Sequence, residues 1–298
     1  ARAWMTARPD LSTRAGLEAI LDVTRAAVRE AAELVYQGFR HPLVVEHKGA
    51  VDLVTEFDQR SESLLRERLG HALAIPIVGE EQGGVASSNE PTFYIDPVDG
   101  TTNFVHGHPF WCVSVGLVAS GLPVLGVVLS PPLGAEWFGY VTPRDRLAVR
   151  RAAASPILGP ATVNEVSCAP SPAATLEDAL LATGFPYDRR TSPDNNFDAF
   201  VAIKRRCQAV RRCGSAALDL CLVADGTYDG YWEKKVRPWD IAGEGAIVRA
   251  AGGRVTDYGG GETFIESGDV IATNGRIHDE LMDELARVRG RAGAVRRR

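Results

Sequence analysis

The chain has 298 residues, of which 45% are hydrophobic and 24% are charged, with 30 Gly and 17 Pro. This is the composition of a globular protein that can bury a large core, and it excludes a low-complexity or disordered chain. Lys and Arg number 33 against 38 Asp and Glu, and six of the Arg lie in the last twelve residues. The first 286 residues therefore carry a formal charge of −11, which argues against a dedicated DNA-binding protein.

Five cysteines are scattered along the chain without a C-x-x-C pair. They predict neither a disulfide framework nor a zinc site, and they favour a reduced, cytoplasmic environment. The N-terminal residues contain no long apolar run of the kind that marks a secretory signal.

In the first half, apolar residues at three- and four-residue spacing predict a helix over roughly 12–37, followed by a second helix that ends near Leu69. Short strands are expected at 75–78 and 93–95. The 27 residues from Pro109 to Ala135 carry no charge and are long enough to span a bilayer. Because Gly and Pro divide this segment into two β-branched runs, it predicts a buried hairpin instead of a membrane span.

The second half begins after an Ala- and Pro-rich stretch, which is a candidate seam between halves 10–150 and 151–286 of a single domain. Residues 287–298 are expected to form a flexible Arg-rich tail. The elements predicted between the seam and the tail are helices at 175–183, 194–209, 214–225 and 240–251 and strands at 228–232 and 270–273. Helices and strands alternate without a regular βαβ rhythm, which indicates layered α and β structure.

Acidic residues stand at the ends of several predicted elements. Asp96 and Asp99 follow a strand with Pro97 between them, so that both carboxylates lie on one tight turn. Oxygen ligands of this kind suit Mg²⁺, and the Gly-Thr-Thr run that comes next can begin a helix whose free amides hold an anion. A site for phosphate ester chemistry and a simple capped turn both remain open at this point.

The other acids are weaker signals when each is taken alone. Glu80 and Glu81 follow a predicted strand, where paired acids usually form a solvated loop. Asp240 suits a helix N-cap, and Asp58 forms a capping-box pattern with Thr55, so both have a structural explanation.

Taken together, these residues resemble the inositol monophosphatase family of Mg²⁺-dependent, lithium-sensitive sugar phosphatases. The resemblance covers about residues 15–285. Its motifs are Lys48 with 52–58, Gly-Glu-Glu at 79–81, the acidic nonapeptide at 96–104, Gly-Ser-Ala-Ala at 214–217, and 239–243 running on to 250–253.

The resemblance implies a layered αβαβα sandwich of the inositol monophosphatase and fructose-1,6-bisphosphatase type, usually a homodimer. It assigns Glu80, Asp96 and the Val98 carbonyl to a first Mg²⁺, and Asp96, Asp99 and Asp240 to a second. A third, weaker ion is expected beside a mobile loop region that includes Lys48, Asp52, Asp58 and Glu81.

The resemblance also implies the remaining roles in the site. Thr101 with Glu80 positions and deprotonates the attacking water, and Asp99 belongs to the same catalytic group. The backbone of Gly100, Thr101 and Thr102 binds phosphate. Ala216 and Glu233 meet the hydroxyls of the substrate, Asp240 is a further substrate-binding residue, and the segment 183–190 lies at the substrate's edge.

The implied activity is hydrolysis of a small phosphate monoester, foremost inositol 1-phosphate, with histidinol phosphate or fructose 1,6-bisphosphate as alternatives. A different class of function also stays open, namely binding of RNA or a transcription partner through the Arg-rich tail. A bilayer partner is not expected, and nucleic acid is the less favoured partner because the body of the chain is acidic.

Overall fold

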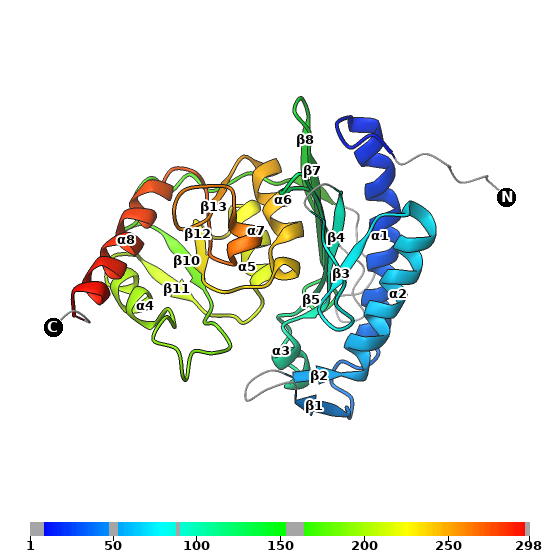
Figure 1. The fold of residues 1–298 in the computed structure, drawn as a ribbon, viewed down its shortest axis with the longest axis horizontal. Coiled ribbons are helices and arrows are strands. Elements are labelled where there is room, and N and C mark those ends of the chain that lie inside the picture. The colour runs from blue at the N-terminus through cyan, green and yellow to red at the C-terminus, as the bar shows by residue number, and fades with distance from the viewer. Residues whose placement is uncertain (1–8, 48–52, 88–89, 153–163, 296–298) are drawn as a thin grey trace.

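The computed structural model describes residues 9–47, 53–87, 90–152 and 164–295. The described chain is built in five layers, seen edge-on from one end to the other in Figure 1. The first layer is a helical pair, α1 (Arg14–Tyr36) and α2 (Glu56–Leu73). Both begin at threonine N-caps, and α1 buries an apolar stripe that runs from Leu17 to Val35.

The second layer is a sheet of seven strands in the order β3-β4-β5-β6-β7-β8-β9. Only β3 and β4 run parallel, and the other neighbours are antiparallel. The strands are β3 (Ile77–Gly79), β4 (Thr92–Asp99), β5 (Cys112–Ala119), β6 (Leu122–Ser130), β7 (Ala135–Val141), β8 (Arg146–Ala152) and β9 (Glu165–Ser167). The uncharged segment forms the β5–β6 hairpin, as predicted, and no helix in the described ranges is long and apolar enough to cross a membrane.

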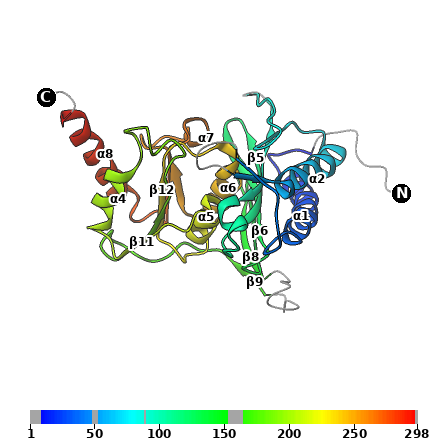
Figure 2. The same ribbon diagram turned by 90° about the horizontal axis from the view of Figure 1, so that it is seen from below.

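Two helices, α5 (Ala216–Ala224) and α6 (Ala242–Ala251), form the middle layer between the sheets (Figure 2). The start of α6 lies very close to the first sheet. A Cβ built on Gly126 of β6 would lie only 1.9 Å from the carbonyl oxygen of Gly243 in α6. A Cβ on Gly116 would similarly meet the Gly243 backbone nitrogen at 2.2 Å. Because glycine has no Cβ, it allows α6 to approach the sheet this closely at these positions. The glycines thereby help to set the position of α6 and of Asp240, which precedes it.

The fourth layer is a five-stranded sheet in the order β11-β10-β12-β14-β13. Its strands are β10 (Leu180–Thr183), β11 (Ala209–Arg211), β12 (Gly230–Glu233), β13 (Arg254–Thr256) and β14 (Val270–Thr273). The last layer consists of α4 (Phe197–Lys204) and α8 (His278–Val295), so the αβαβα sandwich is confirmed. The shorter elements are β1 (Val45–His47), β2 (Leu53–Thr55), α3 (Thr101–Val105), the 3₁₀ turn η1 (Pro238–Asp240) and α7 (Phe264–Ser267).

Several predicted elements of the second half are wrong. The helix at 175–183 is a turn followed by β10, and the helix at 194–209 is shorter and is followed by β11. A short apolar run that is buried does not show whether it is strand or helix, which explains the error at 180–183. The error at 194–209 concerns the bounds of the helix. The strands β7 and β8 and the long α8 were not anticipated.

The Arg-rich tail begins within α8. Residues 287–295 continue α8, Arg287 pairs with Glu284 at 2.7 Å, and Arg289 donates to the carbonyl of Tyr258 at 2.8 Å. The Arg-rich sequence has no apolar periodicity of its own. Arg287 contacts an acid one turn earlier in α8, and Arg289 contacts a carbonyl outside the helix.

Candidate active site

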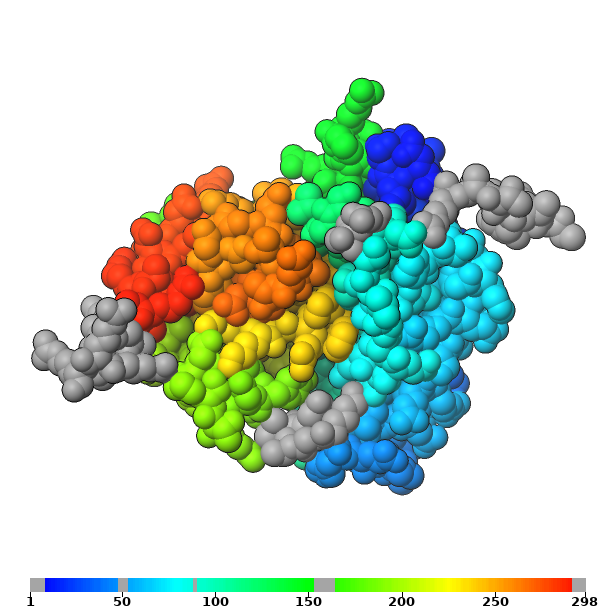
Figure 3. Space-filling model, in the orientation of Figure 1, coloured from blue at the N-terminus to red at the C-terminus, as the bar shows by residue number. Residues whose placement is uncertain are grey.

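A cavity of about 890 Å³ lies where the two sheets and the middle helices meet. Figure 3 shows the molecular surface where the two halves of the chain adjoin: the yellow and orange surface of the C-terminal half borders the cyan surface of the N-terminal half. Residues from both halves line the cavity, including Glu80, Asp96, Asp99, Gly100, Thr101, Thr102, Ala216, Asp219, Glu233 and Asp240.

The two aspartates of the nonapeptide are positioned by an irregularity in β4. The register of β4 against β5 shifts between Asp96 and Asp99, and residues three apart in a regular strand would face opposite sides. The shift lets both line one cavity, which is a common use of a bulge. Asp96 accepts the Val98 amide at 2.9 Å, and the Val98 carbonyl accepts the Thr101 hydroxyl at 2.9 Å.

Glu80 reaches the same place because β3 and β4 are parallel neighbours, so their carboxyl ends lie at one edge of the sheet. The turn that carries it is held from α2 by Glu62, which is fully buried. Glu62 accepts the amides of Glu81 at 2.7 Å and Gln82 at 3.0 Å, and it pairs with Arg66 at 2.8 Å. Sequence reasoning missed Glu62, since its spacing resembles that of any polar helix residue.

Asp99 lies against the beginning of α5. One of its carboxylate oxygens accepts the Ser215 hydroxyl and the Ala217 amide, the latter at 2.8 Å. Burial raises the pKa of Asp99 to about 6, although these hydrogen bonds oppose the rise. Ala216, predicted to touch substrate, lies in the same first turn of α5 and lines the cavity.

Asp240 enters from η1, where its carboxylate accepts the Arg237 amide at 2.9 Å. Burial raises its pKa well above the usual range, and the charges of Asp99 and Glu80 raise it further. Asp96 behaves in the same way, with Glu80, Asp99 and Asp240 all adding to the effect of burial. Four carboxylates from three separate stretches of chain therefore line one cavity, and the charges of their neighbours raise the pKa of Asp96 and of Asp240.

Asp58 does not belong to a mobile loop, and that expectation is wrong. It is the third residue of α2, is fully buried, and completes the capping box with Thr55. Its other carboxylate oxygen accepts the Thr101 hydroxyl at 3.1 Å, and burial raises its pKa. Asp58 thus caps α2 and also contacts a residue that lines the cavity.

The loop after β4 is held across the cavity by Asn103. Its side-chain amide donates to the carbonyls of Phe110 at 2.7 Å and Cys213 at 2.8 Å, which ties α3 to the segment before α5. Gly100, which begins α3, has φ of 92°, and a Cβ there would lie 3.0 Å from the Phe110 carbonyl oxygen. These contacts explain why the motif has glycine and asparagine at these positions.

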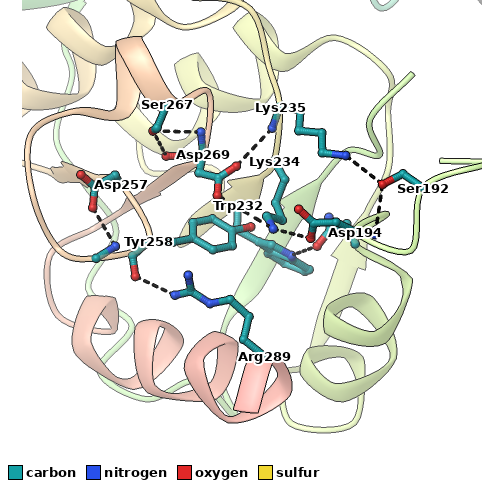
Figure 4. A network of polar contacts seen from close by, with 12 residues as sticks. Ser192, Asp194, Trp232, Lys234, Lys235, Asp257, Tyr258, Ser267, Asp269 and Arg289 are labelled. Carbon is teal, nitrogen blue, oxygen red and sulfur yellow. Dashed lines mark hydrogen bonds and ion pairs between the residues drawn. The ribbon is translucent and has the colours of Figure 1, made fainter. Parts of the chain in front are cut away.

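Glu233 lies at the end of β12 with its carboxylate in the cavity wall. It is 9% exposed, accepts the Tyr231 hydroxyl, and burial raises its pKa to about 7. The neighbouring lysines are engaged elsewhere: Lys234 pairs with Asp194, and Lys235 contacts Asp188 at 2.7 Å and Ser192 at 3.0 Å. Figure 4 shows these lysines reaching toward Asp194 and Ser192.

Two of the predicted third-ion residues, Lys48 and Asp52, lie outside the described residues. Glu81 lies in the turn after β3, where its backbone is held by Glu62. In the described ranges, no group of three or more carboxylate, imidazole or thiol side chains is arranged to hold a metal ion by itself. The donor set nevertheless fits Mg²⁺, which takes one or two carboxylates and completes its coordination with water and substrate oxygens.

Comparison with known proteins agrees with this fold and cavity. The sequence matches the inositol monophosphatase family over residues 16–291. It is 40% identical over 277 residues to the inositol-1-monophosphatase of Synechocystis, covering 91% of this chain and 90% of that protein. It is 34% identical over 277 residues to Nus factor SuhB of Pseudomonas aeruginosa, covering 90% and 96% of the two chains.

Among solved structures, the inositol monophosphatase of Anabaena superposes with a TM-score of 0.76 at 33% identity, covering 91% of this chain and 96% of that one. The fold and cavity are thus those of a phosphoric monoester hydrolase. The chain belongs to the inositol monophosphatase family.

Proposed function

We propose that the protein hydrolyses inositol 1-phosphate to inositol and phosphate with Mg²⁺ as its cofactor. The observation that supports this most is the set of Glu80, Asp96, Asp99 and Asp240, whose charges oppose one another in a buried cavity. A divalent cation is the natural counter-charge for such a set. The Synechocystis relative named inositol-1-monophosphatase supports the choice of substrate.

In this proposal Glu80, Asp96 and the Val98 carbonyl hold one Mg²⁺, and Asp96, Asp99 and Asp240 hold another. A weaker third ion lies near Glu80. When bound, Mg²⁺ lowers the pKa of nearby water and screens the charge of the phosphate group.

The chain's own residues then handle the proton and the substrate. The Thr101 hydroxyl contacts Asp58, so its oxygen can accept a proton from the attacking water while its own proton passes to the Asp58 carboxylate, with Glu80 alongside. The raised pKa of Asp58, caused by burial, makes it a better proton acceptor at neutral pH. The backbone amides of Gly100, Thr101 and Thr102 bind phosphate, and Ala216, Glu233 and Asp240 meet the hydroxyls.

The direct test is phosphate release across inositol 1-phosphate, histidinol phosphate and fructose 1,6-bisphosphate. Activity should disappear in EDTA and return with Mg²⁺. Asp240→Asn should reduce turnover at least about 100-fold while leaving the circular dichroism spectrum intact, because the shape is kept and a charged ligand is lost. Wild-type turnover in EDTA, or full activity of Asp240→Asn, would contradict the metal assignment. Faster hydrolysis of one of the other two compounds would contradict inositol 1-phosphate as the assigned substrate.

A homodimer is part of the same proposal. Three large apolar side chains, Tyr187, Phe197 and Val201, are about half exposed on and before α4. Phe197 and Val201 are one turn apart on α4, and exposed apolar side chains of this kind favour association. Light scattering of the purified protein should give twice the chain mass, and a mass of one chain would exclude the dimer.

A second candidate function is binding of RNA or a transcription partner, which is suggested by the relative named Nus factor SuhB. Because Arg287 and Arg289 have partners in the fold, truncation at 287 would disturb α8. A cleaner test replaces Arg296, Arg297 and Arg298 with Gln and measures RNA retention on filters at two salt concentrations. Equal retention by both proteins would exclude a role for these arginines.

A further inference from the structure

Asp219, in the first turn of α5, is a buried acid that the proposed reaction has not used. Its side chain is 2% exposed, and its Oδ1 atom has no hydrogen-bond partner among the residues that the structure describes. It nevertheless lines the active-site cavity. Native proteins leave few buried acceptors unpaired, because each costs stability, so this one requires an explanation.

The helix itself does not explain the burial. An acid in the first turn of a helix is favoured by the helix dipole, but a solvent-exposed acid would benefit as well. The N-cap position is already served by Ser215, which accepts the Leu218 amide at 3.2 Å. The helix therefore gives no partner to the Oδ1 atom of Asp219, although the side chain lines the cavity.

Glu233 comes to the same part of the cavity from β12. Its carboxylate occupies the space beside Gly184, where a Cβ would lie 2.0 Å from Oε2. Asp219 and Glu233 line the same cavity. Burial raises the pKa of Asp219 well above its usual range, and the charge of Glu233 raises it further. Tyr231 donates to Oε2 of Glu233, and none of the residues that the structure describes donates to its other oxygen, Oε1.

Arginines stand near this pair of acids. Arg189, Arg190 and Arg212 line the same cavity, and the charges of Arg212 and Arg189 act on Glu233. Buried acceptors beside guanidinium donors match a group that both donates and accepts hydrogen bonds, as a hydroxyl does. An ammonium group would suit the acids but would be repelled by the arginines.

We propose that Asp219 binds a hydroxyl of a polyol next to the one that the proposed function gives to Glu233, so that the two carboxylates form one subsite. This inference rests on the proposed phosphatase function and narrows the alcohol part of its substrate. Asp219 is thereby a specificity-determining residue, and it does not take part in the transfer of the phosphoryl group.

The experiment compares wild type, Asp219→Asn and the control Asp198→Asn, which changes an exposed acid of α4. Asp219→Asn should lower kcat/KM for inositol 1-phosphate about ten- to a hundredfold, mainly through KM, and leave p-nitrophenyl phosphate within about twofold. Its Tm without metal should be unchanged or higher, because repulsion with Glu233 is relieved. Equal losses on both substrates, or a lower Tm, would make Asp219 structural and overturn the subsite.

A binding readout separates this inference from the proposed activity. myo-Inositol at millimolar concentration should raise the Tm of wild type and of Asp198→Asn, and it should not raise that of Asp219→Asn. This result would support the subsite even if inositol 1-phosphate proves a poor substrate. Stabilisation by histidinol and not by inositol would overturn the polyol assignment, as would equal effects of inositol on all three proteins.

Discussion

Replacement of Glu62 by Gln tests how the active site is supported from α2. The Glu62 carboxylate is fully buried and accepts the amides of Glu81 and Gln82 while pairing with Arg66. Arg66 in turn donates to the carbonyls of Ile77 and Gly83 on either side of the turn. Glu62 and Arg66 together therefore hold the turn that carries Glu80.

The magnitude follows from the hydrogen bonds that the substitution removes. A glutamine keeps one acceptor oxygen for one of the two amides, and its NH₂ group faces the other N–H. One lost charge-assisted bond and one partly buried N–H left unpaired cost about 2–4 kcal/mol. In a chain of this size the Tm should fall by roughly 5–10 °C. Because Glu80 is displaced, the Mg²⁺ concentration for half-maximal activity should rise about 10- to 100-fold.

The assay is thermal unfolding in EDTA together with a Mg²⁺ titration of phosphate release. Glu67→Gln is the matched control, since Glu67 lies on the same helix and its side chain is 55% exposed. The control should match wild type in both measurements. If Glu62→Gln has the Tm and the Mg²⁺ dependence of Glu67→Gln, the turn does not depend on Glu62 and the reasoning is refuted.

Three further outcomes are expected. Glu233→Gln should slow hydrolysis of inositol 1-phosphate about ten- to a hundredfold and hardly affect p-nitrophenyl phosphate, whereas equal losses would mean that Glu233 supports the metal site. Lithium at millimolar concentration should inhibit phosphate release, and a rate insensitive to lithium would contradict the proposed second metal site. Burial raises the pKa of Glu244 from its ordinary value of 4.5 to about 8. Between these two pH values the folded protein keeps a proton that the unfolded chain has lost, so the metal-free stability should fall as the pH rises from about 4.5 to about 8. Melts of Glu244→Gln in EDTA should show a flatter pH dependence, and an unchanged slope would refute this account.

Local sequence patterns predicted the parts of the site that a few neighbouring residues determine. The nonapeptide at 96–104 indicated two aspartates and a glycine turn, and the structure places them in one cavity. The capping box of Asp58 with Thr55 and the β5–β6 hairpin were also predicted and are confirmed. In each case the signal and the structure lie within one turn or one hairpin, so no distant contact is needed.

Contacts between distant segments decided the rest. Whether the apolar run at 180–183 forms a strand depends on its neighbours β11 and β12, which lie far along the chain. Glu62 and Asp219 occupy ordinary polar positions of helices in the sequence. Glu62 becomes the support of the Glu80 turn only when α2 packs against β3. Asp219 becomes an unpaired acceptor in the cavity only when α5 packs against β12. The burial and electrostatics of these two acids arise from tertiary packing, because desolvation depends on what surrounds a carboxylate in space and not on its neighbours in sequence.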